Sequence, residues 1–121
     1  MAKKILIVDD DESILGACEM TLNDAGYDVK TVDGDGAVVV QNTQTYKPDL
    51  IFIDLILSGS DGGSVVKELK NTKETKKIPV LLISSYANLG EVAQRSGADG
   101  YLAKPFEVRD LMRAIETYIT K

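Results

Sequence analysis

Four short apolar runs in this sequence each end in a polar side chain that could do chemistry on a phosphate. These side chains are Asp9 with Asp10, then Asp54, Ser84 and Lys104. An aspartate can act as a nucleophile toward phosphorus, and carboxylate oxygens are ligands that Mg²⁺ prefers. A hydroxyl and an ammonium group can stabilise the charge on transferring phosphoryl oxygens. If the fold gathers these side chains, they would form a magnesium-dependent phosphoryl-transfer site.

The absence of histidine restricts the chemistry further. The chain has no histidine and a single cysteine, Cys18. This composition excludes a Ser-His-Asp triad, a Cys-His pair, histidine-bound zinc and a phosphohistidine on this chain. It also excludes an internal disulfide and a cysteine-rich metal site, and it fits a reducing compartment. Any reaction must therefore use carboxylates, hydroxyls, lysine, tyrosine or backbone groups.

Size and charge predict one acidic domain. The chain has 121 residues, which we expect to form a single domain over residues 1–121. Apolar residues make up 44% and charged residues 27%, as is typical of a folded globular domain. The formal net charge of −5 disfavours direct binding to nucleic acid. No apolar run is long enough to span a membrane and no secretory signal is visible, so we expect a cytoplasmic location without membrane contact.

Apolar runs alternate with helical patterns along the whole chain. The expected strands cover residues 5–8, 29–32, 50–54, 79–84 and 101–103. Helical patterns lie between the first two strands, at 37–46, around Val65 to Leu69, at 88–96, and from 108 to 119. The helix at 37–46 is expected from its place in the alternation, because its valines and threonines are poor helix formers. Residues 60–63 are expected to form a flexible loop.

This alternation predicts a parallel sheet covered by helices on both faces. In such sheets, ligand sites lie beyond the carboxyl ends of the strands, where the polar side chains above would converge. Two carboxylates about 4 Å apart repel by about 1 kcal/mol even in bulk water, and a divalent cation would remove that repulsion. Each polar residue alone could be a helix cap or part of a solvated turn, but their joint occurrence at strand ends favours a site.

The combined motifs resemble the receiver domain of two-component response regulators, over essentially the full chain. The matching segments are residues 5–10, Asp54, Asp61-Gly62, residues 79–84, Gly97-Ala98 and residues 100–106. The size is most similar to that of stand-alone, chemotaxis-type regulators. The resemblance implies a flavodoxin-like α/β fold, a doubly wound five-stranded parallel sheet of order 2-1-3-4-5 with five helices.

The resemblance also implies roles for individual residues. Asp54 is expected to accept the phosphoryl group, with Ser84 and Lys104 completing the catalytic set. The Mg²⁺ ligands are expected to be Asp9, Asp10, Asp54 and the backbone carbonyl of Ile56. Ser84 and Tyr101 are the expected switch residues. The bond between Lys104 and Pro105 is expected to be cis.

The expected function is a phosphorylation-activated signalling switch. The resemblance implies that a sensor histidine kinase or a histidine phosphotransfer protein donates the phosphoryl group from its phosphohistidine. A downstream protein is expected to bind the face formed by the fourth helix, fifth strand and fifth helix. The implied enzymatic activity is limited to magnesium-dependent autophosphorylation and slow self-dephosphorylation.

Two other functions stay open from the sequence. Asp9 to Ser13 loosely matches the start of haloacid-dehalogenase-type phosphatases, in which the first aspartate, here Asp9, is the nucleophile. The chain could also be a receiver-like interaction module that is never phosphorylated. The aspartate that becomes labelled, and the response to Mg²⁺, would distinguish these functions.

Overall fold

The structure, a computed structural model, describes residues 2–9, 12–57 and 59–119. Its strands are β1 (Lys4–Val8), β2 (Asp28–Val32), β3 (Leu50–Asp54), β4 (Ile56–Leu57), β5 (Ser60–Asp61), β6 (Val80–Ser84) and β7 (Gly100–Ala103). Its helices are α1 (Glu12–Asp24), α2 (Gly36–Tyr46), α3 (Gly62–Lys70), α4 (Leu89–Ser96) and α5 (Val108–Ile119). The main strands and helices therefore match the predicted ones, with ends that differ by a few residues.

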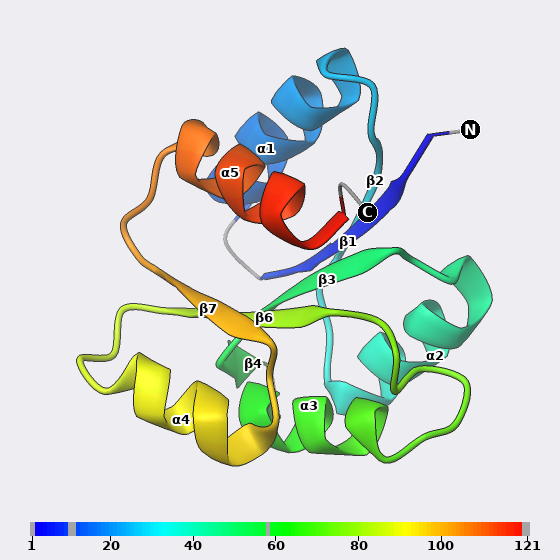
Figure 1. The fold of residues 1–121 in the computed structure, drawn as a ribbon, viewed down its shortest axis with the longest axis vertical. Coiled ribbons are helices and arrows are strands. Elements are labelled where there is room, and N and C mark those ends of the chain that lie inside the picture. Colours follow the sequence, from blue (N-terminus) through cyan, green and yellow to red (C-terminus); the bar gives the residue numbers. More distant parts are fainter. Residues whose placement is uncertain (1, 10–11, 58, 120–121) are drawn as a thin grey trace.

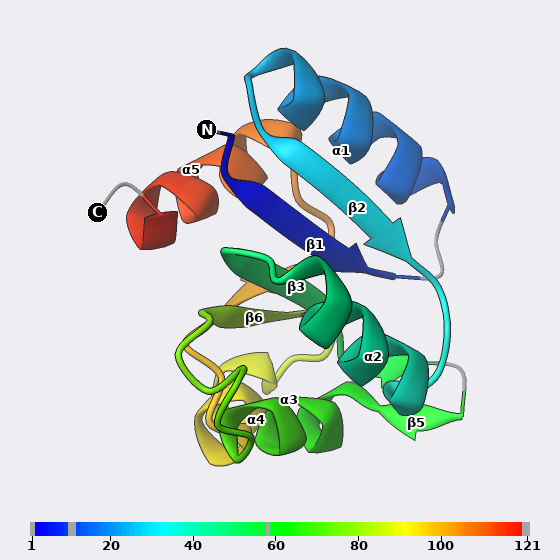
Figure 2. The ribbon, with the colours of Figure 1, turned by 90° about the vertical axis from the view of Figure 1, so that its right-hand side faces the viewer.

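Five strands form one parallel sheet in the order β2-β1-β3-β6-β7. Figures 1 and 2 show α1 and α5 on one face of this sheet and α2, α3 and α4 on the other. All residues of β3 and β6 are buried, because both faces of these central strands are covered. The doubly wound, flavodoxin-like fold of order 2-1-3-4-5 is thus confirmed.

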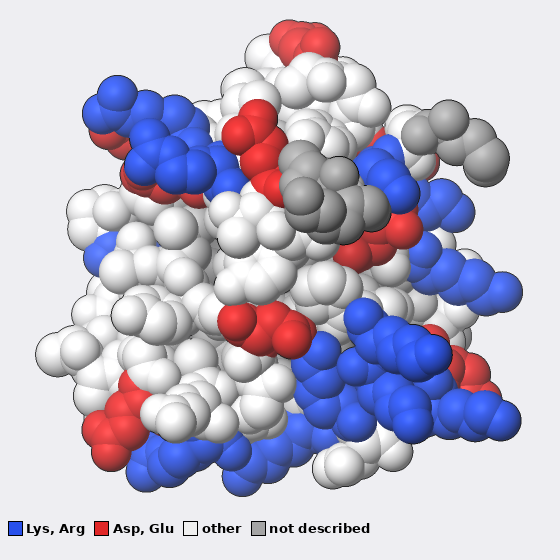
Figure 3. All heavy atoms as spheres, in the orientation of Figure 1, with Lys and Arg blue, Asp and Glu red and all other residues white. Residues whose placement is uncertain are grey.

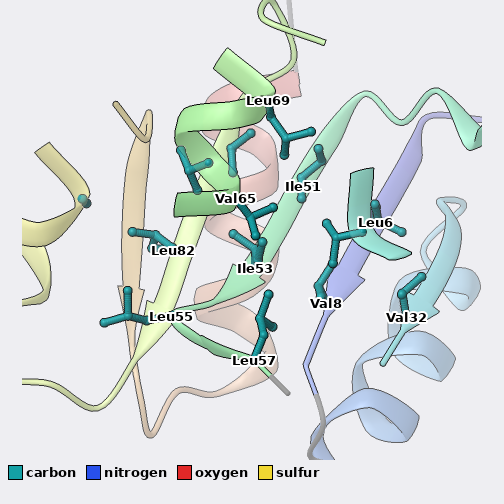
Figure 4. Close-up of a cluster of buried hydrophobic side chains, with 14 of the residues drawn as sticks. Leu6, Val8, Val32, Ile51, Ile53, Leu55, Leu57, Val65, Leu69 and Leu82 are labelled. Carbon is teal, nitrogen blue, oxygen red and sulfur yellow. The ribbon is translucent and has the colours of Figure 1, made fainter. Parts of the chain in front are cut away.

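Alternate residues of the strands build two separate cores. Leu6 and Val8 point toward α2, α3 and α4, where they join Val65 and Leu69 (Figure 4). Ile5 and Ile7 point the other way and pack with residues of α1 and α5, among them Cys18. Burying each large aliphatic side chain contributes roughly 1.5–3 kcal/mol, so these two layers hold the helices on the sheet.

Helix α2 forms despite its run of valines. The Asp35 side chain accepts a hydrogen bond from the Val38 amide at 3.1 Å and so caps the first turn. Val39 is fully buried in the core, which stabilises a helix that its intrinsic propensities do not favour. Lys47 ends the helix in the left-handed conformation, with φ of 54°. Capping and burial therefore explain why the predicted helix is present.

The prediction of a flexible loop at residues 60–63 is wrong. Strands β4 and β5 form a small antiparallel hairpin in which Ile56 pairs with Asp61 and Leu57 with Ser60. Gly59 takes a positive φ of 72° at the turn. Helix α3 begins directly afterwards, because the Asp61 carboxylate accepts a hydrogen bond from the Gly63 amide at 3.0 Å and caps it. The segment is ordered by a turn and a helix cap.

Charge is unevenly spread over the surface. On the face shown in Figure 3, lysine and arginine side chains gather over the α2, α3 and α4 side of the molecule, although the net charge is −5.

Within the described ranges, no helix combines the length and the apolar character needed to cross a lipid bilayer.

Candidate functional site

The carboxyl ends of four parallel strands meet at one edge of the sheet. Asp54 is the last residue of β3 and Ser84 is the last residue of β6. Asp9 follows β1 directly, and Lys104 follows β7 directly. The strand register aligns these positions, because β3 lies between β1 and β6 and β7 pairs with β6. The sheet therefore brings all four residues to one place, as the sequence predicted.

Lys104 connects the two described carboxylates of the site. Its Nζ atom lies 2.9 Å from Asp9 Oδ2 and 3.0 Å from Asp54 Oδ2. The Lys104 backbone amide donates a hydrogen bond to the Ser84 carbonyl at 2.9 Å, which fixes the start of this loop against β6. The peptide bond between Lys104 and Pro105 is cis, as expected. One ammonium group thus joins the carboxyl ends of β1, β3 and β7.

Asp54 is held by the backbone that follows it. One carboxylate oxygen, Oδ1, accepts a hydrogen bond from the Ile56 amide at 3.0 Å. The first residue of α3, Gly62, donates its amide hydrogen to the Leu55 carbonyl at 2.6 Å. A side chain at position 62 would place its Cβ only 2.2 Å from the Asp54 carbonyl oxygen, so only glycine permits this approach.

Burial and charge set the protonation of the site. Burial raises the pKa of Asp54, and the Asp9 charge adds to this rise, while the Ile56 amide and Lys104 oppose it without cancelling it. For Lys104, burial lowers the pKa, but hydrogen bonds to the two carboxylates outweigh burial, and the pKa is raised overall. Lys104 therefore keeps its positive charge at neutral pH.

The donor atoms at this edge suit a hard cation. Asp9 and Asp54 offer carboxylate oxygens, the backbone of Ile56 lies beside Asp54, and the chain has no histidine to add an imidazole. The third predicted carboxylate, Asp10, lies outside the described residues. Among the residues that are described, no three acidic, histidine or cysteine side chains cluster closely enough to hold a metal ion. The described donors fit Mg²⁺ by their chemistry and supply part of a ligand set.

The two expected switch residues lie at different distances from this cluster. Ser84 is buried, and its Oγ accepts a hydrogen bond from the Tyr86 amide at 3.1 Å. Tyr101 is 54% exposed and lies beside α4. Within residues 2–9, 12–57 and 59–119, neither side chain hydrogen-bonds to Asp54 or Lys104. Ser84 is next to the site, because its carbonyl accepts a hydrogen bond from the Lys104 amide, whereas the exposed Tyr101 ring lies against α4.

Sequence reasoning missed the hairpin that follows Asp54. Its signal was the Ser58-Gly59 dipeptide, a common turn former, between residues that can pair as strands. It also missed Ser60, whose Oγ accepts a hydrogen bond from the Gly36 amide at 2.8 Å. No local pattern links two residues that lie 24 positions apart.

Comparisons with known proteins agree with this geometry. The family model described as the response regulator receiver domain matches residues 5–116. The chain is 37% identical to the DNA-binding dual master transcriptional regulator RpaA from a Synechocystis species, over 98% of this chain and 49% of that protein. It spans about half the length of the curated relatives it matches.

Two solved structures share the fold over their whole length. One is the chemotaxis response regulator CheY4 of Vibrio cholerae, with a TM-score of 0.89 and 29% identity over 98% of this chain and 100% of that one. The other is the receiver domain of the sensor histidine kinase PA1611 from Pseudomonas aeruginosa, with a magnesium ion coordinated in its active site cleft. It has a TM-score of 0.87 and 28% identity, and both chains are covered completely.

Proposed function

This chain belongs to the response regulator receiver domain family of two-component systems, and from that premise we propose that it is a switch activated by phosphorylation of Asp54. The observation that carries the proposal is the contact of Lys104 Nζ with both Asp9 and Asp54, at 2.9 and 3.0 Å. A partly buried ammonium group shared by two carboxylates suits a site that must take up further negative charge. We propose that residues 1–121 act as one receiver domain.

Mg²⁺ is the proposed cofactor, held by Asp9, Asp10, Asp54 and the backbone carbonyl of Ile56. The all-oxygen donor set supports this assignment, as does the magnesium ion in the related PA1611 receiver domain. When bound, the ion would supply positive charge for the oxygens of the phosphoryl group. The role of the protein residues is to hold these oxygens in place, with Lys104 as a second fixed positive charge.

The proposed transfer begins with a phosphohistidine on a sensor histidine kinase or a histidine phosphotransfer protein. A carboxylate oxygen of Asp54 forms a bond to phosphorus while the phosphorus–nitrogen bond breaks, and the imidazole nitrogen keeps the electron pair. Slow hydrolysis then reverses the modification, since water attacks phosphorus and Asp54 leaves as a carboxylate. Lys104, whose Nζ lies 3.0 Å from Asp54 Oδ2, would offer positive charge to the phosphoryl oxygens in both steps.

The proposed switch follows from the added charge. A phosphoryl group on Asp54 brings strong acceptor oxygens. In the structure the Ser84 hydroxyl accepts a hydrogen bond from the Tyr86 amide. On phosphorylation this hydroxyl would turn toward the phosphoryl oxygens, and the Tyr101 ring would move from its exposed position toward the sheet. The face of α4, β7 and α5 would then favour a downstream protein partner, by a shift of population between two conformations. We propose that this takes place in the cytoplasm.

The burial of the two carboxylates argues against the phosphatase alternative. The Asp9 side chain is completely buried, whereas 11% of the Asp54 side chain is exposed. A nucleophile must be reached by the phosphorus atom of its donor, so Asp54 is the better placed of the two.

Labelling with acetyl phosphate tests the proposal. Intact-mass measurement of the chain with Mg²⁺ should show one added phosphoryl group, and a chelator should abolish it. Asp54→Asn should remove the labelling, while Asp24→Asn, a matched change at the exposed last residue of α1, should keep it. Unchanged labelling of Asp54→Asn would refute the assignment, and no labelling of the wild-type chain would favour the non-phosphorylated interaction module.

A further inference from the structure

The β5 strand of the β4–β5 hairpin is hydrogen-bonded to the start of helix α2. The Gly36 amide donates a hydrogen bond to Ser60 Oγ at 2.8 Å, between residues that are 24 positions apart in the sequence. Figure 2 shows β5 beside the first turn of α2. Gly36 is the first residue of that helix, so its amide has no partner within the helix. Ser60 therefore satisfies one of the free amides at the start of α2.

The contact needs a close approach of the two segments. A side chain at position 36 would place its Cβ 3.0 Å from Val65 Cγ2 and 3.2 Å from Ser60 Oγ. Both distances are shorter than ordinary van der Waals contact. Glycine at this position lets α2 come against the hairpin and the start of α3. The hydrogen bond from Gly36 to Ser60 therefore depends on glycine at position 36.

The other strand of the hairpin leads into the site. Leu57 pairs with Ser60, and Ile56 pairs with Asp61. The Ile56 amide donates a hydrogen bond to Asp54 Oδ1 at 3.0 Å. The start of α2 is therefore linked to the Asp54 carboxylate in three steps: the hydrogen bond of Gly36 to Ser60, the strand pairing of the hairpin, and the hydrogen bond of Ile56 to Asp54.

We propose that Ser60 is a positioning residue for the Asp54 site. By fixing the hairpin on α2, it holds the Ile56 backbone in the orientation that serves Asp54 and the metal. The proposal rests on the proposed function, because it concerns affinity for Mg²⁺ at the same site. Ser60 itself touches neither Asp54 nor Lys104 among the contacts of the described residues.

Loss of the Ser60 hydroxyl should leave the fold intact. The Asp35 side chain still caps α2 through the Val38 amide, and Val39 still anchors the helix in the core. The Asp61 carboxylate still caps α3. The effect should therefore appear in the orientation of the hairpin.

The test measures Mg²⁺ binding by calorimetry, with Mg²⁺ alone as the probe, on wild type, Ser60→Ala and Ser64→Ala. Losing one hydrogen bond should raise the dissociation constant of Ser60→Ala about three- to tenfold. Ser64→Ala removes an exposed hydroxyl of α3 that makes only a long hydrogen bond of 3.4 Å to Asp61 Oδ2, while the Asp61 cap on Gly63 stays, so it should bind like the wild type. Equal affinity of Ser60→Ala and wild type would overturn the proposal.

A second pair of variants separates positioning from stability. Ser60→Thr keeps the hydroxyl and Ser60→Val replaces it by a methyl group of similar size, so the two differ only in the hydrogen bond. Ser60→Thr should keep the tighter binding and Ser60→Val should lose it; equal affinity of the two would contradict the proposal. A purely structural role would lower the unfolding midpoint without Mg²⁺ and leave affinity unchanged. If the wild-type chain binds no Mg²⁺, the proposed function itself fails, which is a different result.

Discussion

The ring of Tyr101 lies over Gly90 in the first turn of α4. A Cβ atom at position 90 would be 3.2 Å from two ring carbons of Tyr101 and 3.2 Å from its hydroxyl oxygen. Glycine therefore leaves the space in which the exposed ring rests. Tyr101 is one of the two proposed switch residues, and we expect this contact to help hold its ring in the exposed position.

Gly90→Ala should displace the Tyr101 ring and weaken the outward position. Alanine is a better helix former than glycine by up to about 1 kcal/mol, but the crowded ring should offset this gain. We therefore expect Gly90→Ala to increase the free energy of unfolding more when residue 101 is alanine than when it is tyrosine. Urea unfolding of the wild type, the two single variants and the double variant measures this difference. Equal stabilisation in both backgrounds would mean that residue 90 and the ring are not coupled.

Lys104→Met should destabilise the metal-free chain. The change keeps most of the side-chain volume but leaves Asp9 and Asp54 buried near each other without their shared ammonium group. Breaking such a buried ion pair costs about 3 kcal/mol, measurable as a lower urea midpoint in the presence of a chelator.

Arg109→Met is the matched control for that change. Arg109 pairs with Glu107 at 3.0 Å, but both side chains are more than 70% exposed, at 74% and 71%. Exposed pairs contribute up to about 1 kcal/mol and often nothing measurable. A loss of stability in Lys104→Met no larger than that in Arg109→Met would show that the shared contact of Lys104 does not stabilise the metal-free site.

Tyr46 should ionise at a higher pH than an ordinary tyrosine, because its pKa is raised. Burial raises its pKa, and the adjacent Asp28 and Asp49 raise it further, while its hydroxyl donates a hydrogen bond to the Asp28 carbonyl at 3.0 Å. The folded chain favours the neutral phenol, so the stability that Tyr46 contributes is complete below pH ~10 and is lost as the pH rises through the raised value. Ultraviolet absorbance of tyrosinate against pH should show a late component.

Tyr46→Phe should remove that late component and leave the rest of the titration unchanged. An unchanged late component in Tyr46→Phe would assign it to another tyrosine. A titration of the wild type in one step at the ordinary tyrosine value would contradict the effect of burial on Tyr46.

The sequence predicted the place of the site because that place depends on strand order and polarity. The apolar runs before Asp9, Asp54 and Ser84 are buried on both faces, so their direction and parallel arrangement follow from pattern alone. The polar residues at the ends of these strands then have only one edge of the sheet to occupy. The position of Lys104 follows in the same way from the last strand.

The contacts that the sequence could not predict are tertiary. The hydrogen bond of Gly36 to Ser60 and the packing of Tyr101 on Gly90 each join two different elements of the fold at close approach. The periodicity of apolar residues does not show which residues of two elements will be in contact. From the sequence, glycine at positions 36 and 90 is equally consistent with a residue that only weakens a helix.

The most direct test of the central claim is to find which side chain carries the phosphoryl group. The chain is labelled with acetyl phosphate and Mg²⁺ and reduced with borohydride, which converts a phosphorylated aspartate to homoserine, and its peptides are sequenced by mass spectrometry. We predict homoserine at Asp54 and at no other aspartate. Homoserine at Asp9, or at any residue other than Asp54, would contradict the account.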